Sequence, residues 1–368
     1  MAGGTPPMKP SRLFFAAFLA ASWIVPAVAQ SPAPQLLPAS DPRFRYEGRI
    51  DFAAAAAPVL IWQGTRVRLD FEGGELAVVF AGATGQNFFN VSVDGGAPQI
   101  LAVPAGGRQV WRYPAPLGPG RHHLEIFKRS EAAAGHASFA GVELAAGAEA
   151  WAPVPPADRL RMEFFGDSIT VGACNEDGAK DQWDDRRTHN NALSYGALTA
   201  AAFGADYRCT AVSGMGVVTG WTAIKAAQAW DRLYPEVSSP RADLAAWQPD
   251  VAFVNLGEND DSYPKAHQQP FPAAFAADYA ALVRSIRAAY PHAEIVLLRG
   301  GMWGGAKSEP LRTAWEAAVH ELEAADPAVS HFVFTHWSET HPRVADDRAM
   351  ADELTVWLKR QPFLQGHF

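Results

Sequence analysis

Four short polar motifs, each just after an expected strand, carry residues suited to nucleophilic chemistry. In Gly-Asp-Ser-Ile-Thr at 166–170, Ser168 stands before a helix, whose N–H groups stabilise a developing oxyanion well. Ser213-Gly214-Met215-Gly216 could present the Gly214 N–H to the same oxyanion, and Asn259 of Gly-Glu-Asn-Asp could add its side-chain amide. His341, just before the last expected helix, could take the proton of Ser168 and pass it to a leaving alcohol.

Each motif alone also has an ordinary structural interpretation. Ser168 could be a helix N-cap, Gly214 and Asn259 could belong to plain turns, and His341 could be a surface histidine, one of 11 in the chain. Their combination, in the order Ser, Gly, Asn, His and always behind a strand, favours a single catalytic site.

The C-terminal part has the pattern of a parallel sheet covered by helices. Continuous apolar runs such as 251–256 and 294–298 indicate strands buried on both faces. Helical periodicity separates them, and three helix faces are predicted: Phe275, Tyr279, Leu282, Val283 and Ile286; Leu311, Trp315, Val319 and Leu322; Met350, Leu354 and Leu358. In such sheets ligands bind at the carboxyl ends of the strands, where all four motifs fall.

The N-terminal part has short alternating strands instead. Val67, Leu69 and Phe71 alternate with polar residues, and glycine-rich turns separate such runs, which indicates a β-sandwich. We expect a signal peptide at 1–29, a flexible lead-in at 30–43, the β-sandwich domain at 44–147, a proline-rich linker at 148–158 and the α/β domain at 159–368. We also expect the sandwich to contribute little to the chemistry.

The four motifs resemble those of the SGNH (GDSL) hydrolase superfamily over about residues 160–358. The extended run 166–172, the segment Ser194-Tyr195-Gly196-Ala197-Leu198-Thr199-Ala200 and the sandwich domain are similar, more narrowly, to carbohydrate esterase family 2. The resemblance implies a jelly-roll-like domain followed by an α/β/α domain. It also implies a serine esterase that removes acetyl groups from plant polysaccharides such as xylan or glucomannan. The alternatives are an SGNH lipase or thioesterase, and a catalytically inactive carbohydrate-binding protein.

The residue that orients His341 is left open by the sequence. The superfamily usually has aspartate three places earlier, where this chain has Ser338, and some family 2 members lack that aspartate. A backbone carbonyl of 335–337, Glu339 or Ser338 could substitute, and we favour the carbonyl, which gives a Ser168–His341 dyad.

Further site expectations concern substrate contacts, metals and cysteines. Trp303, on a glycine-rich loop, is expected to bind substrate or else to be a core residue, and Asp167 to bind substrate or position its loop. The polar segment 175–191 reads as a solvated loop and not as a metal site, and no cofactor is expected. The two cysteines, Cys174 and Cys209, are predicted to form a disulfide, the alternative being two buried free thiols.

The composition and the N-terminal sequence limit which partners and which location are expected. The net charge of −8 argues against nucleic acid as the main partner. Lys9 and Arg12 precede the apolar run 13–25, and Ala27-Val28-Ala29 suits cleavage before Gln30, so we expect a secreted or periplasmic protein and not a membrane anchor. No later segment is apolar enough to span a membrane, and we expect a monomer whose partner is an acetylated polysaccharide or oligosaccharide.

Overall fold

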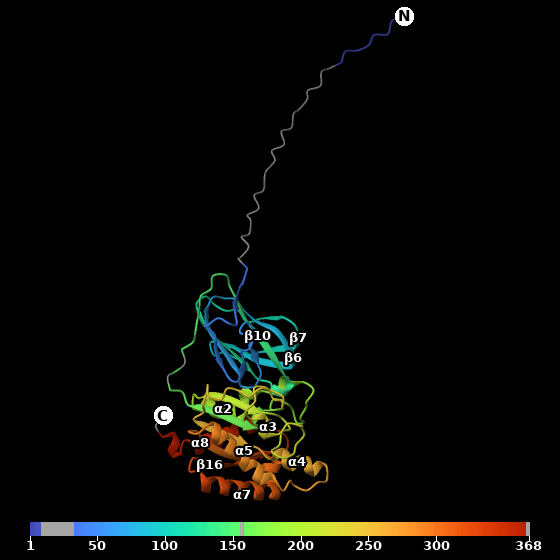
Figure 1. Ribbon diagram of the computed structural model, residues 1–368. Helices are drawn as coiled ribbons and strands as arrows, with labels where there is room; N and C mark the ends of the chain where they lie inside the picture. The colour runs from blue at the N-terminus through green and yellow to red at the C-terminus, as the bar shows by residue number, and fades with distance from the viewer. Residues whose placement is uncertain (9–32, 155, 157, 366–368) are drawn as a thin grey trace. The chain divides into compact units, whose positions relative to one another are not determined.

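The computed structural model of the protein describes residues 1–8, 33–154, 156 and 158–365 (Figure 1). Residues 9–29 of the predicted signal peptide lie outside the described residues. Residues Pro34–Phe368 form one compact unit, which contains two sheets of different type. None of the described helices combines the length and the apolar character that crossing a membrane requires.

The first sheet has 11 strands, paired antiparallel throughout. They are β1 (Gln35–Pro38), β2 (Arg45–Glu47), β3 (Ile50–Asp51), β4 (Val59–Leu60), β5 (Arg66–Glu72), β6 (Leu76–Val93), β7 (Gln99–Gly106), β8 (Gln109–Arg112), β9 (Arg121–Lys128), β10 (Gly135–Leu144) and β11 (Ala150–Trp151). The long β6 pairs with β7, β8, β9 and β10, so the sheet curls around one apolar core. The alternation in β5 buries Val67, Leu69 and Phe71, as predicted.

This sheet extends beyond both expected boundaries of the β-domain. Strand β1 pairs with β10 although it lies in the expected lead-in, and β11 pairs with β5 although it lies in the expected linker. Backbone pairing needs no apolar alternation in so short a strand, which is why the composition of these segments did not indicate it.

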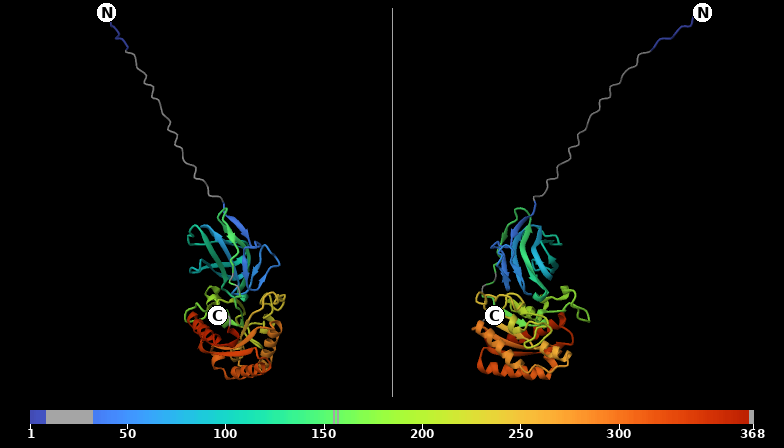
Figure 2. Two further views of the ribbon diagram at one scale, coloured as in Figure 1. Left: turned by 90° about the vertical axis from the view of Figure 1, so that its left-hand side faces the viewer. Right: turned by 45° about the vertical axis from the view of Figure 1, so that its right-hand side comes forward.

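The second sheet is parallel, with strand order β13-β12-β14-β15-β16. Its strands are β12 (Arg161–Gly166), β13 (Asp206–Ala211), β14 (Val251–Asn255), β15 (Glu294–Met302) and β16 (Val329–Ser338). The helices are α1 (Ser168–Val171), α2 (Tyr195–Ala202), α3 (Ala226–Ala229), α4 (Glu258–Ala266), α5 (Phe275–Ala289), α6 (Trp303–Lys307), α7 (Glu309–Ala325) and α8 (Val344–Leu358). Figure 2 shows this sheet between its helices from two further sides.

The three predicted helix faces are confirmed, because every residue named for them is buried. The faces of α5 and α7 pack with one another and with one side of the parallel sheet, and the face of α8 packs with α2 on the other side. The parallel sheet is thus covered on both faces, and its polar residues of interest gather where strands end.

A buried ion pair joins the two domains. Arg49, between β2 and β3, donates through Nη2 to Glu163 Oε1 at 3.0 Å, and both side chains are at most 2% exposed. Glu163 lies in β12, in the middle of the parallel sheet, and also accepts hydrogen bonds from Tyr290 and Thr210. Arg49 donates in addition to the Trp230 carbonyl, so the guanidinium is bound on two sides by the α/β domain.

We predict that Arg49→Met lowers the free energy of unfolding by about 3–5 kcal/mol, because it leaves the Glu163 carboxylate buried without a cation. Urea unfolding measures the change. Arg43→Met is the matched control: its ion pair with Asp41 is only partly buried, with the two side chains 41% and 16% exposed, and its loss should cost less than about 1 kcal/mol. Equal losses in the two variants would contradict the prediction, and the double variant Arg49→Met/Glu163→Gln should regain part of the loss.

Candidate active site

Ser168 and His341 meet at the carboxyl edge of the parallel sheet. Ser168 follows β12 and opens α1, and His341 lies between β16 and α8. Ser168 Oγ is 2.9 Å from His341 Nε2, so the hydroxyl donates a hydrogen bond to the ring nitrogen when that nitrogen carries no proton. This contact joins residues 173 positions apart and sets the nucleophile beside a base.

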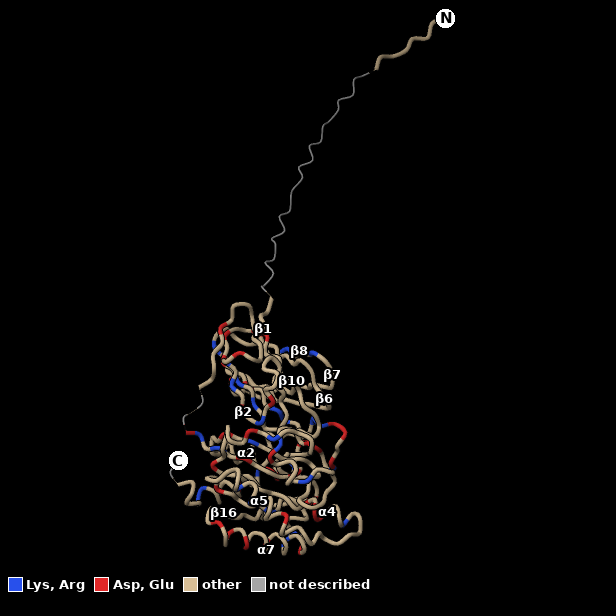
Figure 3. The backbone as a smooth tube through the Cα atoms, viewed as in Figure 1, with Lys and Arg blue, Asp and Glu red and all other residues tan. Residues whose placement is uncertain are grey.

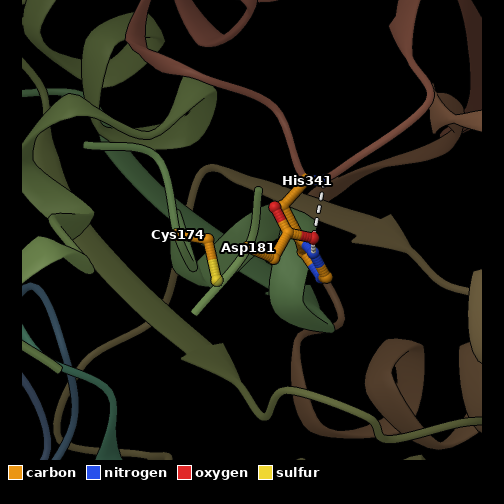
Figure 4. Close-up of side chains that lie close together, drawn as sticks. All are labelled: Cys174, Asp181 and His341. Carbon is orange, nitrogen blue, oxygen red and sulfur yellow. Dashed lines mark hydrogen bonds and ion pairs between the residues drawn. The ribbon is translucent and has the colours of Figure 1, made fainter. Parts of the chain in front are cut away.

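The acceptor that orients His341 is Asp181, which the sequence did not single out for this role. The ring Nδ1–H donates to Asp181 Oδ2 at 2.7 Å, and the His341 backbone N–H lies 3.3 Å from the same oxygen (Figure 4). The expectation of a backbone carbonyl is therefore wrong, and Ser338 instead donates its hydroxyl to the Thr340 carbonyl. The site is a Ser–His–Asp triad whose carboxylate comes from a distant part of the chain.

Asp181 is held as an anion by its surroundings. Burial alone would raise its pKa, but the hydrogen bond and charge of His341, together with a hydrogen bond from Arg343, outweigh burial and hold the pKa of this carboxyl below its usual range. Arg343 Nη1 lies 2.8 Å from Asp181 Oδ1. An ionised partner stabilises the imidazolium that forms when His341 accepts a proton.

The loop 175–191 is folded by its own polar side chains and is not merely a solvated loop. Asp177 accepts from the backbone and the side chain of Gln182, and Arg343 donates to the Gly178 carbonyl, so both sides of Asp181 are fixed. Trp183 of the same loop lies edge to face with His341, at 5.0 Å between ring centroids. The loop thus both orients the histidine and covers it.

Three groups near Ser168 are candidates for the oxyanion hole. Ser168 N–H belongs to the first turn of α1, where backbone donors have no partner within the helix. Gly214 follows β13 with φ +79°, a conformation that favours glycine, and a Cβ there would meet Trp221. Asn259 lies beside them, but its Nδ2 already donates to Asp167 Oδ2 at 3.1 Å and to the Met215 carbonyl at 3.0 Å, so it would have to share one hydrogen.

Asp167 positions its neighbours and does not line the pocket. It is buried, caps α1 by accepting from the Ile169 N–H, and accepts from Asn259. Burial, aided by the nearby Glu258 and Asp260, raises its pKa to about 8 against the effect of these hydrogen bonds. The prediction that it contacts substrate is corrected to a positioning role.

Trp303 is also placed differently from the prediction. It is 44% exposed at the start of α6, and the Lys265 ammonium lies over its ring in a cation–π contact, 3.7 Å from the ring centroid. It is neither a core residue nor one of the residues that line the pocket beside Ser168. Met302, the last residue of β15, does line that pocket, so the strand ends at the site and Trp303 lies just outside it.

That pocket has a volume of about 500 Å³ and opens over Ser168 and His341. Its lining residues are Glu131, Ala133, Ser168, Trp183, Arg186, Ser213, Gly214, Trp221, Thr222, Glu258, Asn259, Ser262, Met302 and His341. Two tryptophans, Trp183 and Trp221, therefore flank the catalytic residues, and Glu131 and Ala133 reach the pocket from the β-domain. This domain therefore helps to form the pocket, and the expectation that it contributes little to the chemistry stays a prediction; no sequence signal near Glu131 indicated that it lies at the site.

The predicted disulfide is wrong: both cysteines are free and buried. Strand β13 pairs with β12, but the register sets Cys209 opposite Phe164 in mid-strand, where its thiol lies near Gln63 and the Thr170 carbonyl. Cys174 lies beyond α1, and its thiol faces the Gln182 carbonyl. The two sulfurs therefore belong to different surroundings.

Cys174, Asp181 and His341 lie close enough to suggest a metal site, with one potential ligand atom from each within 4.8 Å of the others (Figure 4). The chemistry of the set does not suit a cation. His341 Nδ1 and Asp181 are bonded to one another, the Arg343 guanidinium already neutralises the carboxylate, and burial, with the nearby Asp181 and Asp177, raises the pKa of the Cys174 thiol. The arrangement fits proton transfer and not metal binding.

Positively and negatively charged positions are interspersed along the described chain. Figure 3 shows blue and red positions mixed, with several blue positions near β2. There Arg68 contacts Glu47 and Glu125, and Arg159 contacts Glu47. These arginines are therefore engaged in ion pairs between strands and between domains.

Comparison with known proteins agrees with this geometry. Residues 164–355 match the GDSL-like lipase/acylhydrolase family, to which the chain therefore belongs. Residues 46–156 match the carbohydrate esterase 2 N-terminal domain. The chain thus has the two-domain arrangement of family 2 carbohydrate esterases, and the resemblance inferred from the sequence is confirmed.

Individual relatives carry related descriptions. The chain is 31% identical over 332 residues to the cellulase/esterase CelE of Acetivibrio thermocellus, covering 87% of this chain but only 40% of that protein. It is 26% identical over 316 residues to an acetylxylan esterase/glucomannan deacetylase of Cellvibrio japonicus, covering 82% and 85% of the two chains. A family two carbohydrate esterase from Clostridium thermocellum, solved with cellohexaose, superimposes with a TM-score of 0.77 at 29% identity, covering 86% and 98%.

We predict that Asp181→Asn lowers kcat by at least about 10²-fold, because the amide cannot both fix the ring tautomer and stabilise the imidazolium. Steady-state hydrolysis of p-nitrophenyl acetate measures it. Asp184→Asn, an exposed carboxylate of the same loop, is the matched control and should leave kcat unchanged. Glu339→Gln should stay within about tenfold of the wild type; a loss there as large as that of Asp181→Asn would contradict the assignment.

Proposed function

We propose that the protein is a serine esterase that removes acetyl groups from plant cell-wall polysaccharides or oligosaccharides of the xylan or glucomannan type. The observation that carries the proposal is the line of hydrogen bonds from Ser168 through His341 to Asp181 at the floor of an open pocket. The substrate class is supported by the similarity to acetylxylan esterases and to an esterase solved with a glucan oligosaccharide.

The geometry accounts for both halves of an acyl-enzyme reaction. Ser168 Oγ attacks the acetyl carbonyl while its proton passes to His341 Nε2, and the imidazolium then protonates the departing sugar oxygen, which leaves as the free hydroxyl. A water molecule, deprotonated by the same nitrogen, releases acetate. The N–H groups of Ser168 and Gly214, with one shared N–H of Asn259, hold the negative oxygen in both steps.

The rival functions fit the site less well. A lipase or thioesterase for long acyl chains needs an extended apolar groove, whereas this pocket carries charged Glu131, Arg186 and Glu258. An inactive binding protein would have no need for a complete triad. The expected signal peptide supports action outside the cytoplasm, on polymers that cannot enter a cell, and we propose that the enzyme acts there as a monomer.

Acetate release from acetylated xylan, glucomannan and pectin tests this function. The wild type should release acetate from the first two, and Ser168→Ala should be inactive while keeping the unfolding midpoint of the wild type. Wild-type protein that hydrolyses neither these polymers nor p-nitrophenyl acetate would refute the esterase proposal. Preference for long-chain esters over acetyl esters would favour the lipase alternative.

We predict that Trp221→Ala raises KM for the acetylated polymer by about tenfold, a loss of ~1.4 kcal/mol in binding, because its exposed ring lines the pocket and offers a face for a sugar. Trp303→Ala is the matched control: an exposed tryptophan outside the pocket, whose loss should leave KM within about twofold. A larger effect for Trp303→Ala than for Trp221→Ala would restore the sequence-based assignment of Trp303.

A further inference from the structure

Glu131 is the one carboxylate of the β-domain among the residues that line the catalytic pocket. It follows β9 and directly precedes the short 3-10 helix Ala132–Ala134, and its side chain is almost completely buried. Both of its oxygens have partners in the α/β domain. Oε2 accepts from the Ser213 backbone N–H at 3.1 Å, and Oε1 accepts from Arg186 Nη1 at 3.2 Å.

The first of these partners immediately precedes Gly214, the candidate oxyanion donor. The loop that follows β13 is held at its far end by Asp260, which accepts from the backbone N–H groups of Val217, Val218 and Thr219. At its near end, the Ser213 N–H is held by Glu131. The Ser213–Gly214 peptide, whose N–H must point at the oxyanion, lies between these two anchors.

The position of Glu131 is itself fixed against the strand from which the loop starts. Gln63 of the β-domain accepts from the Ala132 N–H at 3.0 Å and donates to the Ala211 carbonyl, at the end of β13, at 2.8 Å. Buried Lys128 donates to the Ser130 carbonyl at 2.9 Å. The segment that bears Glu131 and the end of β13 are thereby tied together.

We propose that Glu131 is a positioning residue of the esterase site: through Ser213 it sets the orientation of the Gly214 N–H, so that the β-domain completes the oxyanion hole. This inference rests on the proposed esterase function. A small displacement of a catalytic group can cost as much as about 10²-fold in rate. Because the oxyanion forms only in the reaction, the effect of Glu131 falls on kcat and not on KM.

Three substitutions in the full chain test the proposal with p-nitrophenyl acetate. Glu131→Ala should lower kcat by about 10- to 100-fold and change KM less than about twofold. Glu131→Asp keeps the charge but is too short to reach Ser213, and should resemble the alanine variant. Glu131→Gln keeps an oxygen that can accept from Ser213, and should recover kcat to within about threefold of the wild type.

A control separates positioning from simple loss of domain contacts. Tyr234→Phe removes a different hydrogen bond between the domains, from the Tyr234 hydroxyl to Asp51 at 2.8 Å, and its residues do not line the pocket. It should leave kcat unchanged. In addition, the inhibition constant of a boronic acid that forms a tetrahedral adduct with Ser168 should rise in Glu131→Ala by the same factor by which kcat/KM falls.

Several results would overturn the inference. Unchanged kcat in Glu131→Ala, a loss confined to KM, or an equal loss in Glu131→Gln and Glu131→Ala would each exclude positioning by hydrogen bonding to Ser213. If Glu131→Ala does not fold, the kcat values of Glu131→Asp and Glu131→Gln decide the question: equal values would exclude positioning by this hydrogen bond. A wild type without esterase activity would refute the proposed function itself, which is a different outcome from normal activity in these variants.

Discussion

The two domains depend on one buried carboxylate. Glu163 lies in β12, the strand after which the nucleophile is placed, and its negative charge is compensated by a guanidinium that the other domain supplies. Replacing the guanidinium with an apolar side chain would leave the Glu163 carboxylate buried without its cation, at a cost far larger than the loss of an exposed ion pair. The β-domain is therefore held against the carboxyl edge of the parallel sheet, and a residue such as Glu131 can serve there as part of the site.

The same docking explains how a loop of the α/β domain becomes rigid enough to hold the catalytic aspartate. Arg129, two residues before Glu131, donates to the Arg187 carbonyl at 2.7 Å and to Glu176, so the β-domain holds the segment that bears Asp181 at both ends. From the opposite side, Arg343 binds Asp181 directly. A carboxylate on a long loop can orient a histidine precisely only when such contacts remove its freedom to move.

Sequence patterns predicted the helices and strands that periodicity defines, and the site residues that follow the ends of strands. The helix faces, the alternating strands and the meeting of Ser168 with His341 follow from local patterns and from the geometry of parallel sheets. The role of Asp181 could not be predicted in this way, because it is one of four aspartates in the polar segment 175–191, and only the fold of the loop places this one beside His341. The cysteine prediction failed for a related reason: strand adjacency was correct, but register and side-chain direction decide whether two sulfurs meet.

The long sequence separations within the triad also indicate when in folding the site forms. Asp181 is 160 residues from His341, and Ser168 is 173 residues from it, so the catalytic contacts are among the most non-local in the chain. Contacts of this kind require the closure of long loops and form only once the sheet and both of its helical layers are in place. Secondary structure and most of the apolar core can therefore exist in a refolding molecule that has no catalytic power, and recovery of activity reports the final closure of the chain.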